Sequence, residues 1–271
     1  MKTFEKYISV GSIALITGAS SGMGLEYCRQ LAASGCQLIM VSNQAEQLQN
    51  CAEELRTQFH VKIWDYFLDL SLDSAADELF NFCTKNGLNV DILINNAGIF
   101  FFKELQGEIC IKAETMLRLH IFTPTRLSML FGNEMKKRGY GYILNVSSIV
   151  SSMSVPGLTM YASTKAYLRT FSRSLYYEMK PYGVSVTTLC PGAVDTSLYS
   201  VLPSIQKLFK IGKKLGMVYT PEKLVRKGLT AMFHHSYCTT PGLINFFFPK
   251  VINLIPSRAV VKIWKKLSKN V

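Results

Sequence analysis

Short aliphatic runs alternate with amphipathic helical segments through the first two thirds of the chain, and this alternation constrains the fold more than any other feature. The expected strands are six runs rich in β-branched and aliphatic residues: 12–17, 37–42, 62–68, 90–95, 142–146 and 184–189. The expected helices carry apolar residues at helical spacing and include 24–34, 45–59, 72–86 and 161–180. Helical crossovers join parallel strands and cover both faces of the sheet. The sequence therefore predicts an α/β fold, a doubly wound parallel sheet with helices on both faces.

The 271 residues are expected to form a single domain, because neither an internal repeat nor a linker divides them. Within it, we expect residues 1–199 to form the α/β core and residues 200–271 to add a basic amphipathic extension. Apolar residues make up 48% of the chain and charged residues 18%, a balance that excludes disordered and collagen-like proteins.

The cysteines and histidines argue against a metal enzyme. Seven cysteines, at positions 28, 36, 51, 83, 110, 190 and 238, include no CxxC pair. An odd number without metal-ligand spacing argues against both a disulfide framework and a zinc site, and favours a reducing compartment. Because the chain has only four histidines, no metal is expected.

Positive charge is concentrated at one end of the chain. The formal net charge is +12, yet residues 1–199 hold 17 basic and 17 acidic residues. Residues 200–271 hold 13 basic residues and one acidic residue, Glu222, so they carry the whole excess. This asymmetry suggests an anionic partner.

A targeting segment is not expected. The apolar stretch 7–19 imitates the core of a signal peptide, but it runs directly into a glycine-rich turn and is better interpreted as a buried strand. No charge-free apolar stretch of about 18 residues lacks Gly, Pro or polar breaks, so no membrane-spanning helix is expected. We expect a cytoplasmic protein, with peripheral attachment to the cytoplasmic face of a membrane as an open possibility.

The first expected strand ends in a glycine-rich turn, where Gly18, Gly22 and Gly24 precede a helix. Glycines at such a turn let the backbone approach a pyrophosphate, whose charge the helix N-terminus stabilises. Taken alone, the motif also suits a plain strand-to-helix turn.

Tyr161 and Lys165 form a second constellation, with Ser147 and Ser148 at the end of the preceding strand. Residues four apart lie on one helical face, so the lysine ammonium can favour the ionised form of the phenol. Tyr161 would then be a usable acid or base near neutral pH. The alternative is a tyrosine packed in the core and a solvated lysine.

Together these segments resemble the short-chain dehydrogenase/reductase family over residues 10 to about 200. The resemblance rests on six motifs in the family's order: TGASSGMG at 17–24, Asp69-Leu70, Asn95-Asn96-Ala97-Gly98, Asn145 to Ser148, YASTK at 161–165, and Pro191-Gly192 with Thr196. It implies a Rossmann-type fold and a nicotinamide dinucleotide cofactor. It also implies that residues 1–199 carry the cofactor and catalytic sites and that residues 200–271 include a lid over the substrate.

The resemblance also implies which residues hold that cofactor. They are Gly18, Ser20, Ser21, Gly22 and Met23 at the pyrophosphate, Asp69 and Leu70 at the adenine, Asn96, Ala97 and Gly98 at the ribose, and Pro191, Val194 and Thr196 at the nicotinamide. Tyr161 also borders the cofactor, and Lys165 would bind ribose hydroxyls.

The implied reaction transfers hydride from the nicotinamide to a substrate carbonyl. The family's serine lies thirteen residues before its tyrosine, which selects Ser148 over Ser147. Ser148 would bind the carbonyl oxygen, Tyr161 would protonate the alkoxide, and Lys165 would lower the pKa of the phenol. His120 takes the place of a family asparagine that acts largely through its backbone carbonyl and a water relay. A histidine simply packed in its helix is the equal alternative.

Cofactor choice depends on the end of the second strand, where an acid would bind the ribose 2′-hydroxyl and a basic residue would accept a 2′-phosphate. Ser42 and Asn43 stand there. Because no acid would repel the phosphate, we expect NADP(H) rather than NAD(H), although the expected arginine is also missing.

The last quarter of the chain has amphipathic segments. Residues 205–217 suggest an apolar lid or an ordinary surface helix, and Thr220 caps a helix expected to end near His235. The apolar stretch 243–256 precedes a basic amphipathic segment, 257–271, that contains Trp264. This order is typical of an anchor on an anionic membrane surface. Alternatively, the apolar residues cover the core or a second copy of the chain, while nucleic acid is not expected.

The combined interpretation is NADPH-dependent reduction of a ketone on a bulky apolar lipid, such as 3-ketosphinganine or a 3-ketoacyl chain. Within the family, the chain resembles the branch of 17β-hydroxysteroid dehydrogenases, 3-ketoacyl reductases and 3-ketosphinganine reductases. The alternatives are a hydroxysteroid or bile-acid dehydrogenase and, in another class, a catalytically idle nucleotide-binding scaffold at a membrane. The sequence shows no counterpart to the family's glycine-rich last strand, so a homodimer is left open.

Overall fold

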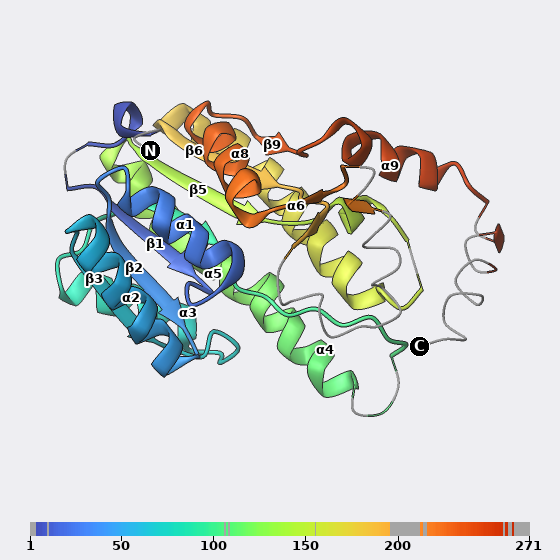
Figure 1. Ribbon diagram of the computed structural model, residues 1–271, viewed down its shortest axis with the longest axis horizontal. Coiled ribbons are helices and arrows are strands. Elements are labelled where there is room, and N and C mark those ends of the chain that lie inside the picture. The colour runs from blue at the N-terminus through green and yellow to red at the C-terminus, as the bar shows by residue number, and fades with distance from the viewer. Residues whose placement is uncertain are drawn as a thin grey trace.

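The computed structural model describes residues 4–9, 11–105, 107, 109–154, 156–195, 212–213, 216–256, 258–259 and 262. Its centre is a seven-stranded sheet in the order β3-β2-β1-β4-β5-β6-β9, with every neighbouring pair parallel (Figure 1). The strands are β1 (Ile13–Thr17), β2 (Gln37–Ser42), β3 (Ile63–Phe67), β4 (Val90–Asn95), β5 (Gly141–Val146), β6 (Val184–Leu189) and β9 (Cys238–Thr239). The predicted doubly wound parallel sheet is confirmed.

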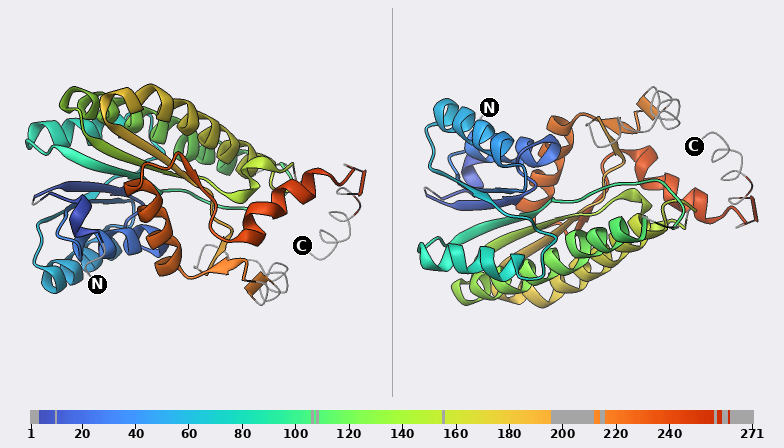
Figure 2. Two further views of the ribbon diagram at one scale, coloured as in Figure 1. Left: turned by 90° about the horizontal axis from the view of Figure 1, so that it is seen from above. Right: turned by 90° about the horizontal axis from the view of Figure 1, so that it is seen from below.

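Helices cover both faces of this sheet (Figure 2). One face packs against α1 (Gly22–Ala32), α2 (Ala45–Phe59) and α8 (Pro221–Phe233), and the other packs against α3 (Ala75–Lys85), α5 (Thr123–Arg138) and α6 (Thr159–Met179). The described residues also form α4 (Ile109–Leu117), α9 (Leu243–Asn253), the short helices η1 (Glu5–Tyr7), η3 (Ile149–Ser152) and η4 (Lys180–Tyr182), and a π-helical turn, η2 (Arg118–Phe122). A separate parallel pair joins β7 (Ala193–Val194) to β8 (Val218–Tyr219).

The two cores divide the strand residues by alternation. In β1 every residue is buried, with Ala14 and Ile16 in the core beneath α1, α2 and α8, and Ile13 and Leu15 in the core beneath α3, α5 and α6. Burial on both faces explains why the strands are continuous apolar runs in the sequence. Each fully buried aliphatic side chain contributes about 1.5–3 kcal/mol to stability.

Several predicted elements match the structure in full, including strands 37–42, 90–95 and 184–189 and helix 45–59. The helix expected from Leu72 begins instead at Ala75. The carboxylate of Asp69 accepts hydrogen bonds from the backbone and hydroxyl of Ser71, so the chain makes a turn before the helix begins. The expectation of six strands also needs correction, because β9 adds a seventh at the edge. A two-residue strand is too short to show periodicity.

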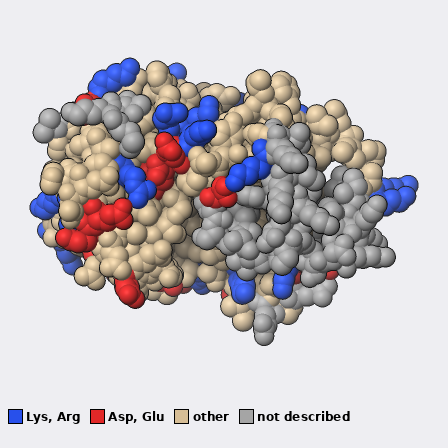
Figure 3. Space-filling view, in the orientation of Figure 1, with Lys and Arg blue, Asp and Glu red and all other residues tan. Residues whose placement is uncertain are grey.

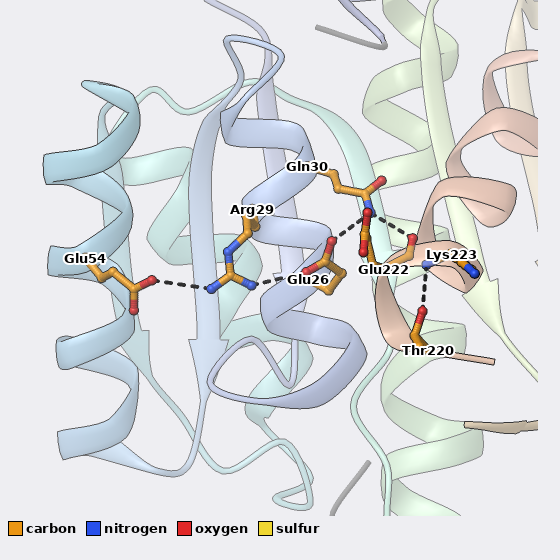
Figure 4. Close-up of polar contacts among 7 residues, drawn as sticks. All are labelled: Glu26, Arg29, Gln30, Glu54, Thr220, Glu222 and Lys223. Atoms are coloured by element: carbon orange, nitrogen blue, oxygen red, sulfur yellow. Dashed lines mark hydrogen bonds and ion pairs between the residues drawn. The ribbon is translucent and has the colours of Figure 1, made fainter. Parts of the chain in front are cut away.

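Polar contacts fix α8 against α1 (Figure 4). Gln30 donates from Nε2 to the carboxylate of Glu26 at 2.8 Å and to the backbone carbonyl of Glu222 at 3.0 Å. Arg29 pairs with Glu26 at 3.1 Å and with Glu54 of α2 at 3.4 Å. The bond from Gln30 holds the start of α8 against α1. The ion pair between Arg29 and Glu54 ties α2 to α1.

Thr220 caps α8 as predicted, since its Oγ1 accepts a hydrogen bond from the N–H of Lys223 at 3.5 Å. A threonine cap of this kind stabilises a helix by about 1 kcal/mol. The predicted helix to His235 ends at Phe233.

Acidic and basic side chains are interspersed over α1 and α2 (Figure 3), as expected for the neutral first part of the chain. In the last quarter, most of the predicted segments 205–217 and 257–271 lie outside the described residues. Within the described residues, no helix has the length and hydropathy needed to cross a membrane. The same part of the chain holds no cluster of three metal-ligating side chains, and all seven cysteines are free thiols.

Candidate active site

A cavity of about 540 Å³ lies at the carboxyl ends of the strands, where the order turns from β1 to β4. Loops that follow β1 to β6 all contribute to its lining. This edge, at the switch in strand order, is where open α/β sheets bind their ligands.

The glycine turn forms one wall of the cavity and packs directly against the loop after β4. Gly18 has φ +67°, and a Cβ at this position would lie 3.0 Å from the Cα of Ala97. A Cβ at Gly24 would lie 1.9 Å from the carbonyl oxygen of Gly18. No larger residue fits at position 24 without moving the backbone, so the turn and the first residues of α1 are held at close approach.

Thr17, the last residue of β1, joins the glycine turn to the loop after β4. Its Oγ1 accepts hydrogen bonds from the N–H groups of Asn96 (3.0 Å) and Ala97 (3.1 Å), and donates to the carbonyl of Ile94 (3.3 Å). The side-chain amide of Asn96 donates in return to the carbonyl of Thr17 at 3.0 Å. Sequence reasoning treated Thr17 only as the first residue of a motif and missed this positioning role.

The far end of the cavity is lined by Ser42 and Asn43 after β2, and by Asp69 and Leu70 after β3. The hydroxyl of Ser42 lies 2.8 Å from that of Ser20 in the glycine turn. No acidic residue stands directly after β2, in agreement with the sequence.

Ser148 follows β5, and its backbone is fixed on both sides. The N–H of Ser147 donates to the carbonyl of Leu189 at 2.7 Å, and the N–H of Ile149 donates to the carbonyl of Pro191 at 2.9 Å. Ser148 is buried to 6% exposure. The segment that carries the predicted catalytic serine is therefore bonded to the loop predicted to flank the nicotinamide.

Tyr161 and Lys165 lie one turn apart on α6 and both line the cavity. The Nζ of Lys165 is 5.7 Å from the ring centre of Tyr161 and donates to the carbonyl of Val146 at 2.9 Å. Burial lowers the pKa of Lys165 to about 8. Phe100 packs edge-to-face on Tyr161, with ring centres 4.9 Å apart. The ring of Tyr161 therefore has both Phe100 and the ammonium group of Lys165 as neighbours.

His120 lies in the π-helical turn and is 1% exposed. Its Nε2 accepts a hydrogen bond from the N–H of Ile99 at 3.1 Å, so the proton is on Nδ1, which lies 3.0 Å from Oγ1 of Thr164. Burial, together with the charge of Lys165, lowers the pKa of His120 well below its ordinary value. A Cβ on Gly98 would lie 2.5 Å from Nε2, so the ring fits only against glycine.

The π-helical turn ends at Phe122, and Pro124 follows it in the first turn of α5. Proline has no N–H, so the carbonyl of His120 loses the donor that an α-helix would give it four residues later. A second cavity of about 10 Å³, room for roughly one water molecule, is lined by His120, Pro124, Lys165 and Thr17 among others.

Buried amides support the site from beneath. Asn95 donates to Oδ1 of Asn145 at 2.8 Å and to the hydroxyl of Ser128 at 3.1 Å, and Asn145 donates to the hydroxyl of Ser172 at 2.8 Å. These bonds tie β4 and β5 to α5 and α6. Sequence reasoning quoted both asparagines as motif residues but assigned them no role.

The cavity gathers almost all of the predicted site residues. Those that line it are Gly18, Ser20, Ser21, Gly22, Met23, Ser42, Asn43, Asp69, Leu70, Asn96, Ala97, Gly98, His120, Tyr161, Lys165, Pro191 and Val194. Ser148 is not in the lining, although its neighbour Ser147 is, and Thr196 lies outside the described residues. The sequence analysis missed the apolar lining of Ile99, Phe100 and Leu119, for which no motif gives a signal.

The family model described as short chain dehydrogenase matches residues 12–205. The chain belongs to the short-chain dehydrogenase family. Members are oxidoreductases that use a nicotinamide dinucleotide, and this site suits one: the close-packed glycine turn leads into α1, and a continuous cavity joins Asn43 to Tyr161.

Similar short-chain dehydrogenases include 3-oxoacyl reductases. The very-long-chain 3-oxoacyl-CoA reductase of Mus musculus is 29% identical over 203 residues, which cover 73% of this chain and 64% of the mouse protein. The match therefore spans less than two thirds of that relative. The 3-oxoacyl-[acyl-carrier-protein] reductase FabG of Aquifex aeolicus (strain VF5) is 30% identical over 222 residues, 79% of this chain and 87% of FabG.

Solved structures of other dehydrogenases share the fold. A 7beta-hydroxysteroid dehydrogenase aligns with a TM-score of 0.83 over 98% of this chain and all of its own, at 24% identity. The bulky-bulky ketone specific alcohol dehydrogenase from Comamonas testosteroni aligns with a TM-score of 0.74 at 26% identity, over 97% of this chain and 96% of its own.

Proposed function

We propose that this short-chain dehydrogenase reduces a ketone on a bulky apolar lipid, a 3-keto long-chain lipid such as 3-ketosphinganine or a 3-ketoacyl chain. The observation that carries the proposal is the cavity beside Tyr161 and Lys165, whose further lining by Ile99, Phe100 and Leu119 is apolar. An apolar wall around a few polar groups favours a hydrophobic substrate held by its reacting carbonyl. Similarity to 3-oxoacyl reductases supports the same substrate class.

Each polar residue would have one role. A bound nicotinamide dinucleotide supplies the hydride. Ser148 would donate a hydrogen bond to the substrate carbonyl oxygen, and Tyr161 would donate a proton to the same oxygen as it gains charge. Lys165, buried beside the phenol, would favour its ionised form and bind the ribose hydroxyls.

NADPH is the proposed form of the cofactor. Ser42 and Asn43 place no carboxylate where the extra phosphate of the adenosine ribose would lie. The hydroxyls of Ser20 and Ser42, 2.8 Å apart, are available as neutral partners for it.

His120 would act through its backbone rather than its ring. The ring already bonds Ile99 and Thr164, and burial keeps it neutral. His120 and Lys165 both line the small cavity, and the proline at position 124 cannot donate to the His120 carbonyl as an α-helix would require. A water in that cavity would carry protons toward the lysine, the role implied for the family's asparagine.

We also propose that residues 200–271 bind the surface of an anionic membrane, on its cytoplasmic face. The described part of this region includes α9, where the exposed apolar side chains are Leu243, Ile244, Phe246, Phe247 and Val251, followed by Leu254. Leu243 is 80% and Leu254 is 84% exposed. The excess of 12 positive charges in the same region would attract anionic lipid.

α9 packs against segments that flank the site. The exposed Asn253 donates from its side-chain amide to the carbonyl of Ser152 in η3 at 2.6 Å. Asn245 of α9 is buried, and a Cβ on Gly192 would lie 2.6 Å from its amide nitrogen. A helix between the bilayer and the cavity would let a lipid ketone enter without crossing water. A homodimer that covers α9 is the competing arrangement.

The experiment is NADPH oxidation, with NADH alongside, against 3-ketosphinganine, a long-chain 3-ketoacyl thioester and 3-, 7- and 17-ketosteroids. We expect turnover of a long-chain ketone, a preference for NADPH, and a loss of at least about 100-fold in Tyr161→Phe, within the range of general acid catalysis. Tyr177→Phe, an exposed tyrosine on the same helix, is the matched control.

If only the ketosteroids are turned over, the protein is a hydroxysteroid dehydrogenase instead. If no ketone in the panel is turned over, or if Tyr161→Phe keeps full activity, the proposed enzymatic function is wrong. A cellular phenotype that survives Tyr161→Phe would favour the membrane-bound scaffold.

A further inference from the structure

Two cysteines meet at the sheet edge behind the predicted nicotinamide loop. Cys190 directly follows β6, and Cys238 begins β9, the neighbouring parallel strand. Their Sγ atoms are 3.9 Å apart. The N–H of Cys190 also donates to the carbonyl of Thr239 at 2.8 Å, so the backbone holds both residues in place.

The two thiols differ in exposure and charge environment. Cys190 is 1% exposed, whereas Cys238 is half-buried. Contact with Cys190 and the guanidinium groups of Arg169 and Arg173 on α6 lower the pKa of Cys238 to about 7. The same contact, together with burial, raises the pKa of Cys190. One thiol is therefore a ready nucleophile, and its neighbour is a protected thiol within reach.

The remaining cysteines lack this combination. Burial raises the pKa values of the Cys28, Cys36 and Cys83 thiols. The thiol of Cys51 donates to the carbonyl of Ser20, and its pKa is raised chiefly by burial. Cys110 is exposed and provides an internal reference for an ordinary surface thiol.

We propose that Cys190 and Cys238 form a site of reversible oxidation, at which hydrogen peroxide or an organic hydroperoxide converts the two thiols to a disulfide. The Cys238 thiolate attacks the peroxide, an S–O bond forms, the O–O bond breaks, and hydroxide or alkoxide leaves. The Cys190 sulfur then attacks the sulfenic acid, an S–S bond forms, the S–O bond breaks, and water leaves with the Cys190 proton. Two electrons pass from the thiols to the peroxide, and a dithiol reductant reverses the change.

The disulfide would act on the site through the backbone of Cys190. Closing 3.9 Å to the roughly 2.05 Å of an S–S bond moves one or both sulfurs. The residues on either side, Leu189 and Pro191, accept the hydrogen bonds that fix Ser147 and Ile149 around Ser148. We expect the oxidised protein to turn over at least fivefold more slowly. This consequence rests on the proposed function, whereas disulfide formation does not.

The test measures the covalent product directly in the full chain. The protein is treated with hydrogen peroxide, free thiols are alkylated under denaturing conditions, and peptides are identified by mass spectrometry. We expect a linked peptide pair containing positions 190 and 238, lighter by two hydrogens, that disappears on treatment with dithiothreitol. Dimedone traps sulfenic acids as stable adducts. In its presence, we expect Cys190→Ser to accumulate the adduct at Cys238, and we expect Cys238→Ser to form no adduct at Cys190.

Cys110→Ser is the matched control and should leave the linked pair unchanged. The linked peptide pair is measured in the wild-type protein. The test of the disulfide therefore still holds if Cys190→Ser fails to fold. The proposal is wrong if Cys238 is oxidised no faster than Cys110, or if either cysteine of the pair links to another partner instead. A linked pair without ketone turnover would support the dithiol site and contradict only the proposed function.

Discussion

The imidazole of His120 accepts a hydrogen bond at Nε2 from the backbone N–H of Ile99, across 3.1 Å. That bond ties the loop after β4, which lines the cavity, to the π-helical turn between α4 and α5. It requires a neutral ring, because a protonated imidazole has no acceptor nitrogen. The histidine thus makes the geometry of the site depend on its own protonation state.

The first prediction concerns the stability of the fold at low pH. The pKa of His120 is lowered in the folded protein and returns to about 6.5 on unfolding, so the unfolded chain binds more protons below that pH. Stability should therefore fall as pH drops from about 6.5. We expect the free energy of unfolding in urea to fall by about 1 kcal/mol more between pH 6 and pH 5 in the wild type than in His120→Asn. Equal slopes in both proteins would contradict a buried neutral ring.

Lys165 gives a second prediction, a trade between stability and activity. Burial lowers its pKa to about 8 in the folded protein, against about 10.4 in an unfolded chain. Folding at neutral pH therefore removes the charged ammonium group of Lys165 from water, which costs stability. Lys165→Met should raise the free energy of unfolding by about 1–3 kcal/mol at pH 7 while abolishing ketone turnover.

The direction in which stability changes with pH tests whether burial of the Lys165 charge is the cause. Because the folded pKa is the lower one, the wild type gains stability as pH rises from about 8 to 10, and its deficit against Lys165→Met should shrink. A variant that is less stable than the wild type at every pH would show that the bond to Val146 outweighs the burial penalty.

The third prediction is steric and concerns the glycine turn. A Cβ at position 24 would meet the carbonyl oxygen of Gly18 at 1.9 Å, so Gly24→Ala must displace the turn. We expect NADPH binding, followed by fluorescence, to weaken at least about 30-fold, equivalent to about 2 kcal/mol. Gly87→Ala is the control, since φ is +65° there but no atom lies within 4 Å of the added Cβ. Similar affinities in the two variants would contradict the close approach.

Much of this fold and site could be predicted from the sequence, because the signals are local. Strands buried on both faces produce continuous apolar runs, and a phosphate-binding turn needs glycines at fixed positions. The roles of Thr17, Phe100 and the Asn95–Asn145 pair could not be predicted, because each depends on a contact between distant segments. The packing of His120 against Gly98 is of the same kind, since neither residue alone indicates it.

The fourth prediction tests α9 as the element that meets lipid. Phe247 is 54% exposed and Leu254 is 84% exposed. The Nζ of Lys250 lies 4.0 Å from the ring centre of Phe246, so a positive charge accompanies these exposed apolar side chains. Binding of the full chain to vesicles of phosphatidylserine and phosphatidylcholine, measured by co-sedimentation, should weaken at least fivefold in Phe247→Asp.

The control for α9 is Ile111→Asp, which places the same charge on an apolar residue of α4 that is 70% exposed. Vesicle binding by this variant should equal that of the wild type, and raising the salt concentration should weaken binding by both proteins, because the basic charges of residues 200–271 supply part of the attraction. If Phe247→Asp binds vesicles normally but changes from dimer to monomer in sedimentation velocity, α9 is covered by a second copy of the chain. The membrane proposal would then be wrong, while the assignment of the cavity to a lipid ketone would still depend on turnover alone.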